Sequence, residues 1–237
     1  MFKTFVIGAL ALALAACGAL KPHNAARPNP NEPLSAPDQR PPGKLYRVDG
    51  GRSELRILVY RAGPLARLGH NHVMVNRSLS GQANLADAPD ASGFRLIVPI
   101  AGFVVDDAQA RREEGTDFDA EVPEEAKAGT LQNMRSPAVL DADEFPTITV
   151  NSIAFSAPAA AAGADSMVAT VAISVAGHES KVEVPFTVQW DSNHLSASGS
   201  LQVRQSALGL TPYSLMLGAL QVQDAMTIKF KIEAAAG

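Results

Sequence analysis

Residues 226–233 read Met-Thr-Ile-Lys-Phe-Lys-Ile-Glu, so every second residue of this stretch is apolar. Successive side chains of a β-strand point to opposite faces, whereas a helix would spread the same residues around its circumference. One face of the predicted strand carries Met226, Ile228, Phe230 and Ile232, and the other carries Thr227, Lys229, Lys231 and Glu233. The stretch therefore predicts a strand with one side against an apolar interior and one side in water.

The same alternation recurs along the chain from Leu45 onward, with Gly, Pro, Asn and Asp between the segments. It is found at residues 55–59, 79–85, 94–100, 182–188 and 195–203, and further strands are expected at 147–155 and 165–175. About eight to ten strands in one domain favour a closed antiparallel barrel. We therefore predict an all-β protein with an antiparallel barrel of eight strands or slightly more.

One interval lacks the alternation of a strand. Pro123 precedes two acidic residues and a segment that includes Leu131 and Met134, which is typical of a helix start. Ser136-Pro137 suggests a short second turn ending near Leu140. The barrel is therefore expected to carry one helical excursion.

An eight-stranded barrel is just wide enough to hold one slender ligand. Small residues are expected on the inward faces, at Gly81, Ala83, Ala197 and Gly199. They fit a hollow barrel, and they equally fit a filled barrel whose interior tapers. The pattern alone leaves both alternatives open.

The N-terminus is expected to be a targeting segment. An apolar run at residues 5–16 follows the positive charge of Lys3, as in a secretory signal peptide, and is too short to cross a bilayer as a helix. Leu14-Ala15-Ala16-Cys17 resembles the bacterial lipobox, which implies removal of residues 1–16 and acylation of Cys17. The alternative is an ordinary signal peptide with an incidental cysteine.

The next segment, residues 17–43, is rich in proline and is predicted to be a semi-extended tether. Residues 44–237 then form the barrel domain. Acyl chains on Cys17 would attach the protein to a membrane. Gly18 stands where sorting to the inner membrane would use Asp, so we expect the outer membrane, facing the periplasm.

Composition narrows the range of partners. The 237 residues include 20 basic and 24 acidic side chains, a formal net charge of −4, and no dense basic cluster. Nucleic acid is therefore excluded as an expected partner, because phosphate binding needs a concentrated basic surface. Cys17 is the single cysteine, so the mature domain would contain no disulfide.

Several stretches match a known family in order. They are 45–49 with Ser53, Gly69-His70, 141–149, 175–178 followed by 184–186, and 201–210. Together they resemble the YceI-like family of secreted lipocalin-like proteins, so the expected barrel is lipocalin-like. The resemblance implies an extended eight-stranded barrel with a helix at one side and a tunnel for a long isoprenoid or fatty chain. The sequence departs from the family at 204–206, where the family commonly pairs Arg with an acidic residue.

His70 and His72 are the sharpest local feature. Residues i and i+2 of a strand share a face, so both imidazoles could reach one head group or one metal ion. Zinc requires three or four ligands, and His178 is the candidate third. The third alternative places both histidines on a solvated rim, because Val73 and Val75 on the opposite face are equally suited to a core.

The remaining charged residues are interpreted mainly as solvated surface groups. Arg61, Arg67 and Arg77 could bind a phosphate or carboxylate, or could be solvated loop residues. The mixed charges of 106–114 suggest an exposed connection. No nucleophile elbow, zinc-protease motif or phosphate loop is present in the sequence, so no enzyme activity and no cofactor are expected.

We therefore expect non-catalytic binding of an isoprenoid or fatty amphiphile inside the barrel. One alternative is a metal-binding protein or metal-dependent enzyme that uses His70 and His72, and another is a filled barrel acting as an adaptor. An unpaired edge strand would allow a homodimer. The residues expected to contact the ligand are His70, His72, Arg67, Phe94, Leu96, Val98, Phe186, Leu201, Arg204 and Phe230.

Overall fold

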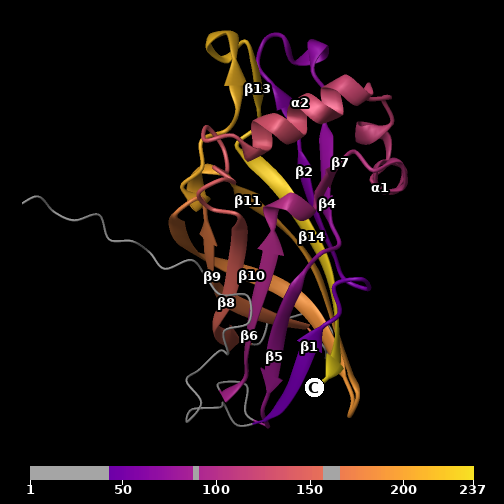
Figure 1. The fold of residues 1–237 in the computed structure, drawn as a ribbon, viewed down its shortest axis with the longest axis vertical. Helices are drawn as coiled ribbons and strands as arrows, with labels where there is room; N and C mark the ends of the chain where they lie inside the picture. The colour runs from indigo at the N-terminus through magenta and orange to yellow at the C-terminus, as the bar shows by residue number, and fades with distance from the viewer. Residues whose placement is uncertain (1–42, 88–90, 157–165) are drawn as a thin grey trace, which may run out of the picture.

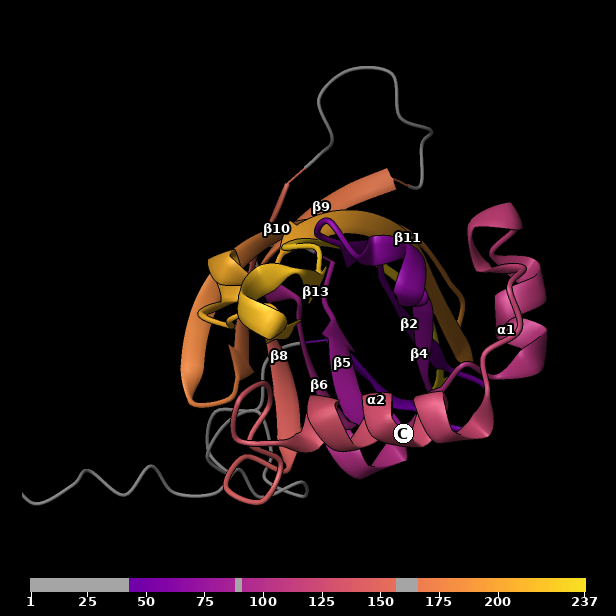
Figure 2. The ribbon, with the colours of Figure 1, turned by 90° about the horizontal axis from the view of Figure 1, so that it is seen from above.

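The computed structural model describes residues 43–87, 91–156 and 166–237. Eight strands form a closed antiparallel barrel, seen from the side in Figure 1 and from one end in Figure 2. The barrel strands, in hydrogen-bonded order, are β1 (Lys44–Val48), β5 (Ser80–Leu85), β6 (Gly93–Pro99), β8 (Thr147–Ser156), β9 (Ser166–Val175), β10 (His178–Trp190), β11 (His194–Arg204) and β14 (Ala225–Ala236), which pairs again with β1. The predicted all-β lipocalin-like barrel is confirmed.

Three further strands extend the wall toward one end of the barrel. They are β2 (Glu54–Val59), β4 (His72–Asn76) and β7 (Phe103–Val105), which continue from β14 in the sheet order. β14 is long enough to pair with both β2 and β1, since Phe230 lies opposite Leu55 and Ala234 lies opposite Val48. The extensions rise beside one another below α2 in Figure 1.

A small second sheet lies at the same end, which we call the upper end. It consists of β12 (Ser214–Leu215), β13 (Leu220–Val222) and β3 (Arg61–Ala62). The 3₁₀ turns η1 (Ala66–Leu68) and η6 (Met216–Gly218) flank its strands. The C-terminus lies at the opposite, lower end (Figure 1).

Two α-helices lie outside the barrel wall. The predicted helix is confirmed as α2 (Glu124–Arg135), which lies across one side of the upper end in Figure 2. A second helix, α1 (Ala108–Glu113), was not predicted. Residues 136–140 form hydrogen-bonded turns, as in the bond from the Val139 N–H to the Ser136 carbonyl. Within the described ranges, no helix is long and apolar enough to span a membrane.

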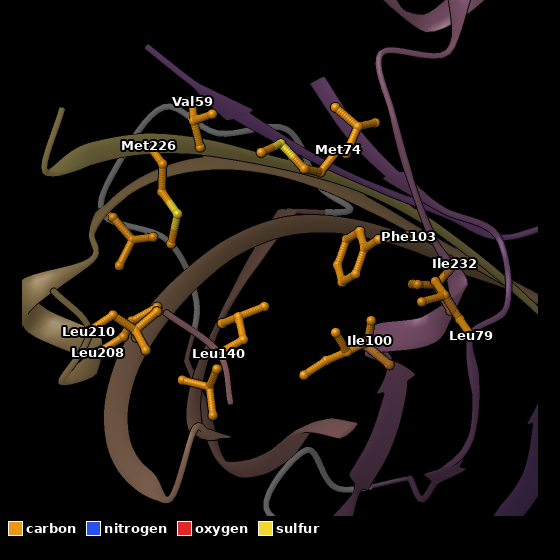
Figure 3. Packing of buried hydrophobic residues seen from close by; sticks show 14 residues of the cluster. Val59, Met74, Leu79, Ile100, Phe103, Leu140, Leu208, Leu210, Met226 and Ile232 are labelled. Carbon is orange, nitrogen blue, oxygen red and sulfur yellow. The ribbon is translucent and has the colours of Figure 1, made fainter. Parts of the chain in front are cut away.

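Apolar packing occurs on both sides of the barrel wall. The largest cluster lines the interior, and Figure 3 shows Met226, Phe103 and Leu140 directed into it from different elements. A second cluster fills the space between α1 and the outer face of β2 and β4, where Val73 and Phe118 are buried. Both faces of β4 are therefore covered, which explains why its sequence does not distinguish an inner from an outer side.

The interpretation of residues 106–114 as an exposed connection is wrong for Asp106 and Arg111, whereas Arg112 and Glu113 are exposed. Asp106 and Arg111 are both buried, because α1 folds back onto the outer face of β4. Asp107 caps the helix, with its carboxylate accepting a bond of 2.9 Å from the Ala110 N–H. The predicted signal peptide, Cys17 and the tether up to residue 42 lie outside the described residues.

Ser53 fixes the bend between β1 and β2. Its side chain is buried, and its hydroxyl donates to the Asp49 carbonyl at 2.7 Å while accepting from the Glu233 N–H at 3.0 Å. The hydroxyl therefore satisfies a backbone donor of β14 at the point where β14 changes partner from β2 to β1.

We expect Ser53→Ala to lower the free energy of unfolding by about 1–3 kcal/mol, because the buried Glu233 N–H loses this acceptor. Urea denaturation followed by circular dichroism measures the change. Ser200→Ala, at an exposed position on β11, is the matched control and should change stability little. Equal stability of the two variants would contradict this role for Ser53.

Candidate functional site

The barrel encloses an apolar cavity of about 580 Å³. Strands all around the wall contribute inward side chains, since alternate residues of a strand share a face. On β14 these are Met226, Ile228, Phe230 and Ile232, the apolar face of the stretch read from the sequence. The volume lies within the range of about 300–1,000 Å³ typical of small-molecule sites. The barrel is hollow, so the alternative of a filled barrel is wrong.

A second apolar cavity of about 200 Å³ lies toward the lower end. Phe94 and Phe230 line both cavities, and the ring of Phe94 lies 6.0 Å from that of Phe155, measured between centroids. The two cavities therefore follow one axis. β14 contributes side chains to this path from Met226 to Ala234, which is about 26 Å of strand at about 3.3 Å per residue.

The polar side chains of the main cavity gather at its upper end. β4 begins and β11 ends there, and α2 contributes residues from above. The lining residues with polar groups are Arg61, His70, His72, Thr130, Asn133, Gln205, Tyr213 and Gln221. The cavity is therefore polar at its upper end and apolar along the rest of its length.

His72 connects the cavity to a buried ion pair. Its Nδ1 lies 2.6 Å from Asp106 Oδ2, and its Nε2 lies 3.2 Å from the hydroxyl of Thr130 on α2. Asp106 also accepts from the Val73 N–H at 2.9 Å and from Arg111 Nη1 at 2.6 Å. The guanidinium of Arg111 bonds in addition to the carbonyl of Asn71. The ring of His72 is thus held in one orientation between the buried Asp106 and Thr130, which lines the cavity.

Electrostatics fix the protonation of this cluster. Burial of the Asp106 carboxyl raises its pKa, but the bonds from His72 and the Val73 N–H and the nearby positive charge outweigh burial, so the pKa lies below its ordinary value. The carboxyl is therefore ionised, and His72 Nδ1 donates to it. For His70, burial lowers the pKa, and the charges of His72 and Arg111 lower it further. His70 is therefore uncharged near neutral pH.

Comparison with known proteins assigns the fold to a family. The model of the YceI-like domain matches residues 46–234, which is most of the chain. The chain belongs to the YceI-like family. No curated protein that was compared matches it.

Solved structures support the same assignment of the fold. BcnA from Burkholderia cenocepacia is 18% identical, with a TM-score of 0.55 over 78% of this chain and 98% of that one. A polyisoprenoid binding domain from Saccharophagus degradans, implicated in plant cell wall breakdown, is 12% identical, with a TM-score of 0.52 over 81% of this chain and 98% of that one. At these identities the similarity concerns the fold.

Most of the residues predicted to contact a ligand lie on the interior of this YceI-like barrel. Their contact with a ligand stays a prediction. Those that line the main cavity are His70, His72, Phe94, Leu96, Val98, Leu201 and Phe230, and Phe186 lines the second cavity. His72, the first residue of β4, and His70, two residues before it, therefore both face inward.

Two arginines predicted to contact the ligand do not line either cavity. Arg204 lies between the inward-facing Val203 and Gln205 on the chain, and its side chain is 76% exposed, 3.9 Å from Asp224. Arg67 is exposed on η1. Both predictions are corrected, because the alternation of the strand and the turn direct these side chains into solvent.

The structure does not bring together the three histidines of the metal-site alternative, since His70 and His72 line the main cavity and His178 does not. His178 is exposed at the start of β10 and packs against Gly209. Both ring nitrogens of His72 already face partners. In the part of the chain that the structure describes, no group of three or more His, Cys, Asp or Glu side chains could hold a metal ion.

Sequence reasoning missed four residues of the site. Thr130 and Asn133 lie on the face of α2 that also carries Ala126, a face that helical spacing would have revealed. No sequence pattern identifies Asp106 and Arg111, since a buried ion pair and an exposed ion pair have the same appearance in a charged stretch of sequence. Only the capping position of Asp107 pointed to a helix there.

We expect Asp106→Asn to destabilise the fold by about 3–5 kcal/mol at pH 7, because the buried Arg111 loses its counter-ion. The lowered pKa means that this stabilisation is complete above the ordinary value of 3.8 and is lost as the pH falls through the lower pKa of the folded state. The gap between wild type and variant should therefore narrow in acid.

Urea denaturation at pH 7 and at pH 3 measures this gap. Asp119→Asn, at an exposed position nearby, is the control and should show a small and constant difference. A gap of the same size at both pH values for Asp106→Asn would contradict ionisation of the carboxyl in the folded protein.

Proposed function

We propose that this YceI-like protein binds one isoprenoid or fatty amphiphile in its barrel without chemical change. The apolar chain lies along the cavity and the polar group lies at the upper end, near His72 and Thr130. The observation that carries the proposal is an elongated apolar interior whose polar lining is confined to one end. The relative from Saccharophagus degradans, a polyisoprenoid binding domain, supports the same class of ligand.

The energetics favour a chain-like ligand. Each 100 Å² of apolar surface removed from water contributes about 2.5 kcal/mol, so a long chain needs few polar contacts. Rigid strands from all around the barrel supply the lining, and a preformed cavity lowers the entropic cost of binding. Affinity then comes mainly from chain burial, and the hydrogen-bonding groups at the upper end orient the head group.

The proposal includes attachment to the bacterial envelope. The support is the sequence of residues 14–17 and the proline-rich segment that follows Cys17. An acylated Cys17 would hold the barrel close to a bilayer, and Gly18 favours the outer membrane, facing the periplasm. A protein in that place is near a supply of amphiphiles that are poorly soluble in water.

The experiment is extraction of the purified full-length protein with organic solvent, followed by mass spectrometry. We expect one class of amphiphile at close to one molecule per chain. A barrel that is repeatedly empty, and that is not stabilised against heat by added quinones or polyprenols, would contradict the proposal.

Val184→Trp tests where the ligand lies. Val184 on β10 lines both cavities, so an indole there would block the path between them. Glu183→Trp adds the same side chain to the exposed outer face of β10 and is the matched control. We expect the bound amphiphile to fall by roughly tenfold in Val184→Trp, which corresponds to about 1.4 kcal/mol, and to stay unchanged in the control. Equal loss in both would place the amphiphile outside the barrel.

A further inference from the structure

Four large apolar side chains are exposed together at the upper end of the barrel. Leu217 is 108% exposed, Met216 72%, Leu68 61% and Leu215 44%. We refer to these four residues as the rim patch. Single exposed apolar residues are ordinary, but a cluster on one projecting edge marks a surface that contacts something apolar.

The rim patch is assembled from two distant parts of the sequence. Gln221 of β13 pairs with Ala62 of β3, and Leu65 N–H donates to the Ala219 carbonyl at 2.8 Å. These bonds hold η1 and η6 next to each other. Figures 1 and 2 show the indigo and yellow turns side by side at the upper end, above the barrel wall.

The rim patch is continuous with the cavity. Leu68 and Leu215 are exposed on the outside and also line the cavity, together with Leu220 of the same small sheet. A path of apolar surface therefore runs from the projecting edge into the interior. The polar groups of the cavity lie along this path, at the upper end.

The backbone of η6 adopts a strained conformation at the two residues whose side chains are most exposed. Met216 has φ of 52° and Leu217 has φ of 56°, in the left-handed region that favours Gly and Asn. Leu217 is thus unfavourable in two respects, because its apolar side chain is exposed to water and its backbone lies in a region that is strained for Leu. Such outliers point to a role for the side chain itself.

The two segments that carry the rim patch contain charges of one sign. Residues 60–72 and 205–223, which supply the small sheet and both turns, contain no acidic residue. Arg61 and Arg67 are exposed there, although the whole chain has a net charge of −4. An apolar edge with nearby arginines matches the surface of an anionic bilayer, where acyl chains lie beneath negative head groups.

We propose that the upper end of the barrel docks onto an anionic lipid bilayer, with Met216 and Leu217 inserted among the acyl chains and the arginines at head-group level. The cavity would then open toward lipid rather than water. The purpose of this contact, exchange of an amphiphile between bilayer and barrel, rests on the proposed function. The contact itself requires no ligand in the cavity.

The test uses the full-length chain with an environment-sensitive NBD dye on a new cysteine at Ser214→Cys, an exposed position of β12 beside the rim patch. The parent chain, whose single cysteine is Cys17, gives the labelling background. Asn193→Cys, exposed in the turn at the lower end, is the matched control position. The probes are phosphatidylglycerol-rich vesicles and phosphatidylcholine vesicles.

We expect dye emission at residue 214 to rise by roughly twofold or more and to shift to shorter wavelength with the anionic vesicles, as for a group that enters the interface. The rise should be smaller with phosphatidylcholine and absent at residue 193. No response at residue 214, or an equal response at residue 193, would overturn the proposal. Equal responses to the two vesicle types would overturn the assignment to an anionic surface.

A second variant tests whether the dye response requires the side chains of the rim patch or only closeness of residue 214 to the vesicle. Met216→Asn with Leu217→Asn keeps residues suited to the left-handed backbone, so the melting temperature should not fall. The response at residue 214 should be lost in this variant. Ile153→Asn, at an exposed apolar position on β8, should leave the response intact. A response unaffected by the double variant would overturn the role of the rim patch.

The dye response is also measured in Val184→Trp, which is expected to lose its amphiphile. Comparing the two readouts separates this test from that of the proposed function. A response at residue 214 in a chain that never carries an amphiphile would support docking while the proposed function fails. A silent dye in a chain that retains its amphiphile would overturn docking while the proposed function stands.

Discussion

Closure of the ring by β14 is the constraint on which the rest of the molecule depends. β14 is hydrogen-bonded to β11 along its length, and on its other edge it pairs first with β2 and then with β1. The change of partner occurs at the turn that Ser53 stabilises. Because the ring is closed by backbone bonds, the wall does not need a filled interior to keep its shape.

The cavity removes part of the interior packing, so contacts outside the largest cluster must add to the stability of the wall. The outer face of β2 and β4 is packed against α1, where Val73 and Phe118 are buried. The buried pair of Asp106 and Arg111 joins the same helix to β4. At the lower end, Tyr46 and Leu195 belong to a third buried cluster. The wall is therefore stabilised from outside and from below, and the cavity can stay open.

The sequence predicted what depends on periodicity and missed what depends on burial. Alternation identified the inward face of β14, and helical signals located α2, because both follow from local geometry. The same logic failed for β4, where Val73 and Met74 are both buried on opposite faces. The charges of 106–114 were read as solvated, because only the fold reveals that Arg111 lies against Asp106. Arg204 was predicted to contact the ligand, although its neighbours Val203 and Gln205 occupy the inward face.

The polar groups at the upper end of the cavity are held in fixed orientations by neighbouring residues. The carboxylate of Asp106 is buried behind His72 and engaged by Arg111 and a backbone N–H, so it is not presented to the cavity as a free base. His70 is uncharged near neutral pH, and His72 is held between Asp106 and Thr130. The upper end therefore offers oriented hydrogen-bonding groups that need little rearrangement when a ligand arrives, which lowers the entropic cost of binding. Because an apolar path leads away from these groups, the amphiphile of the proposed function would lie in one direction, with its chain toward the lower end and its head group at the upper end.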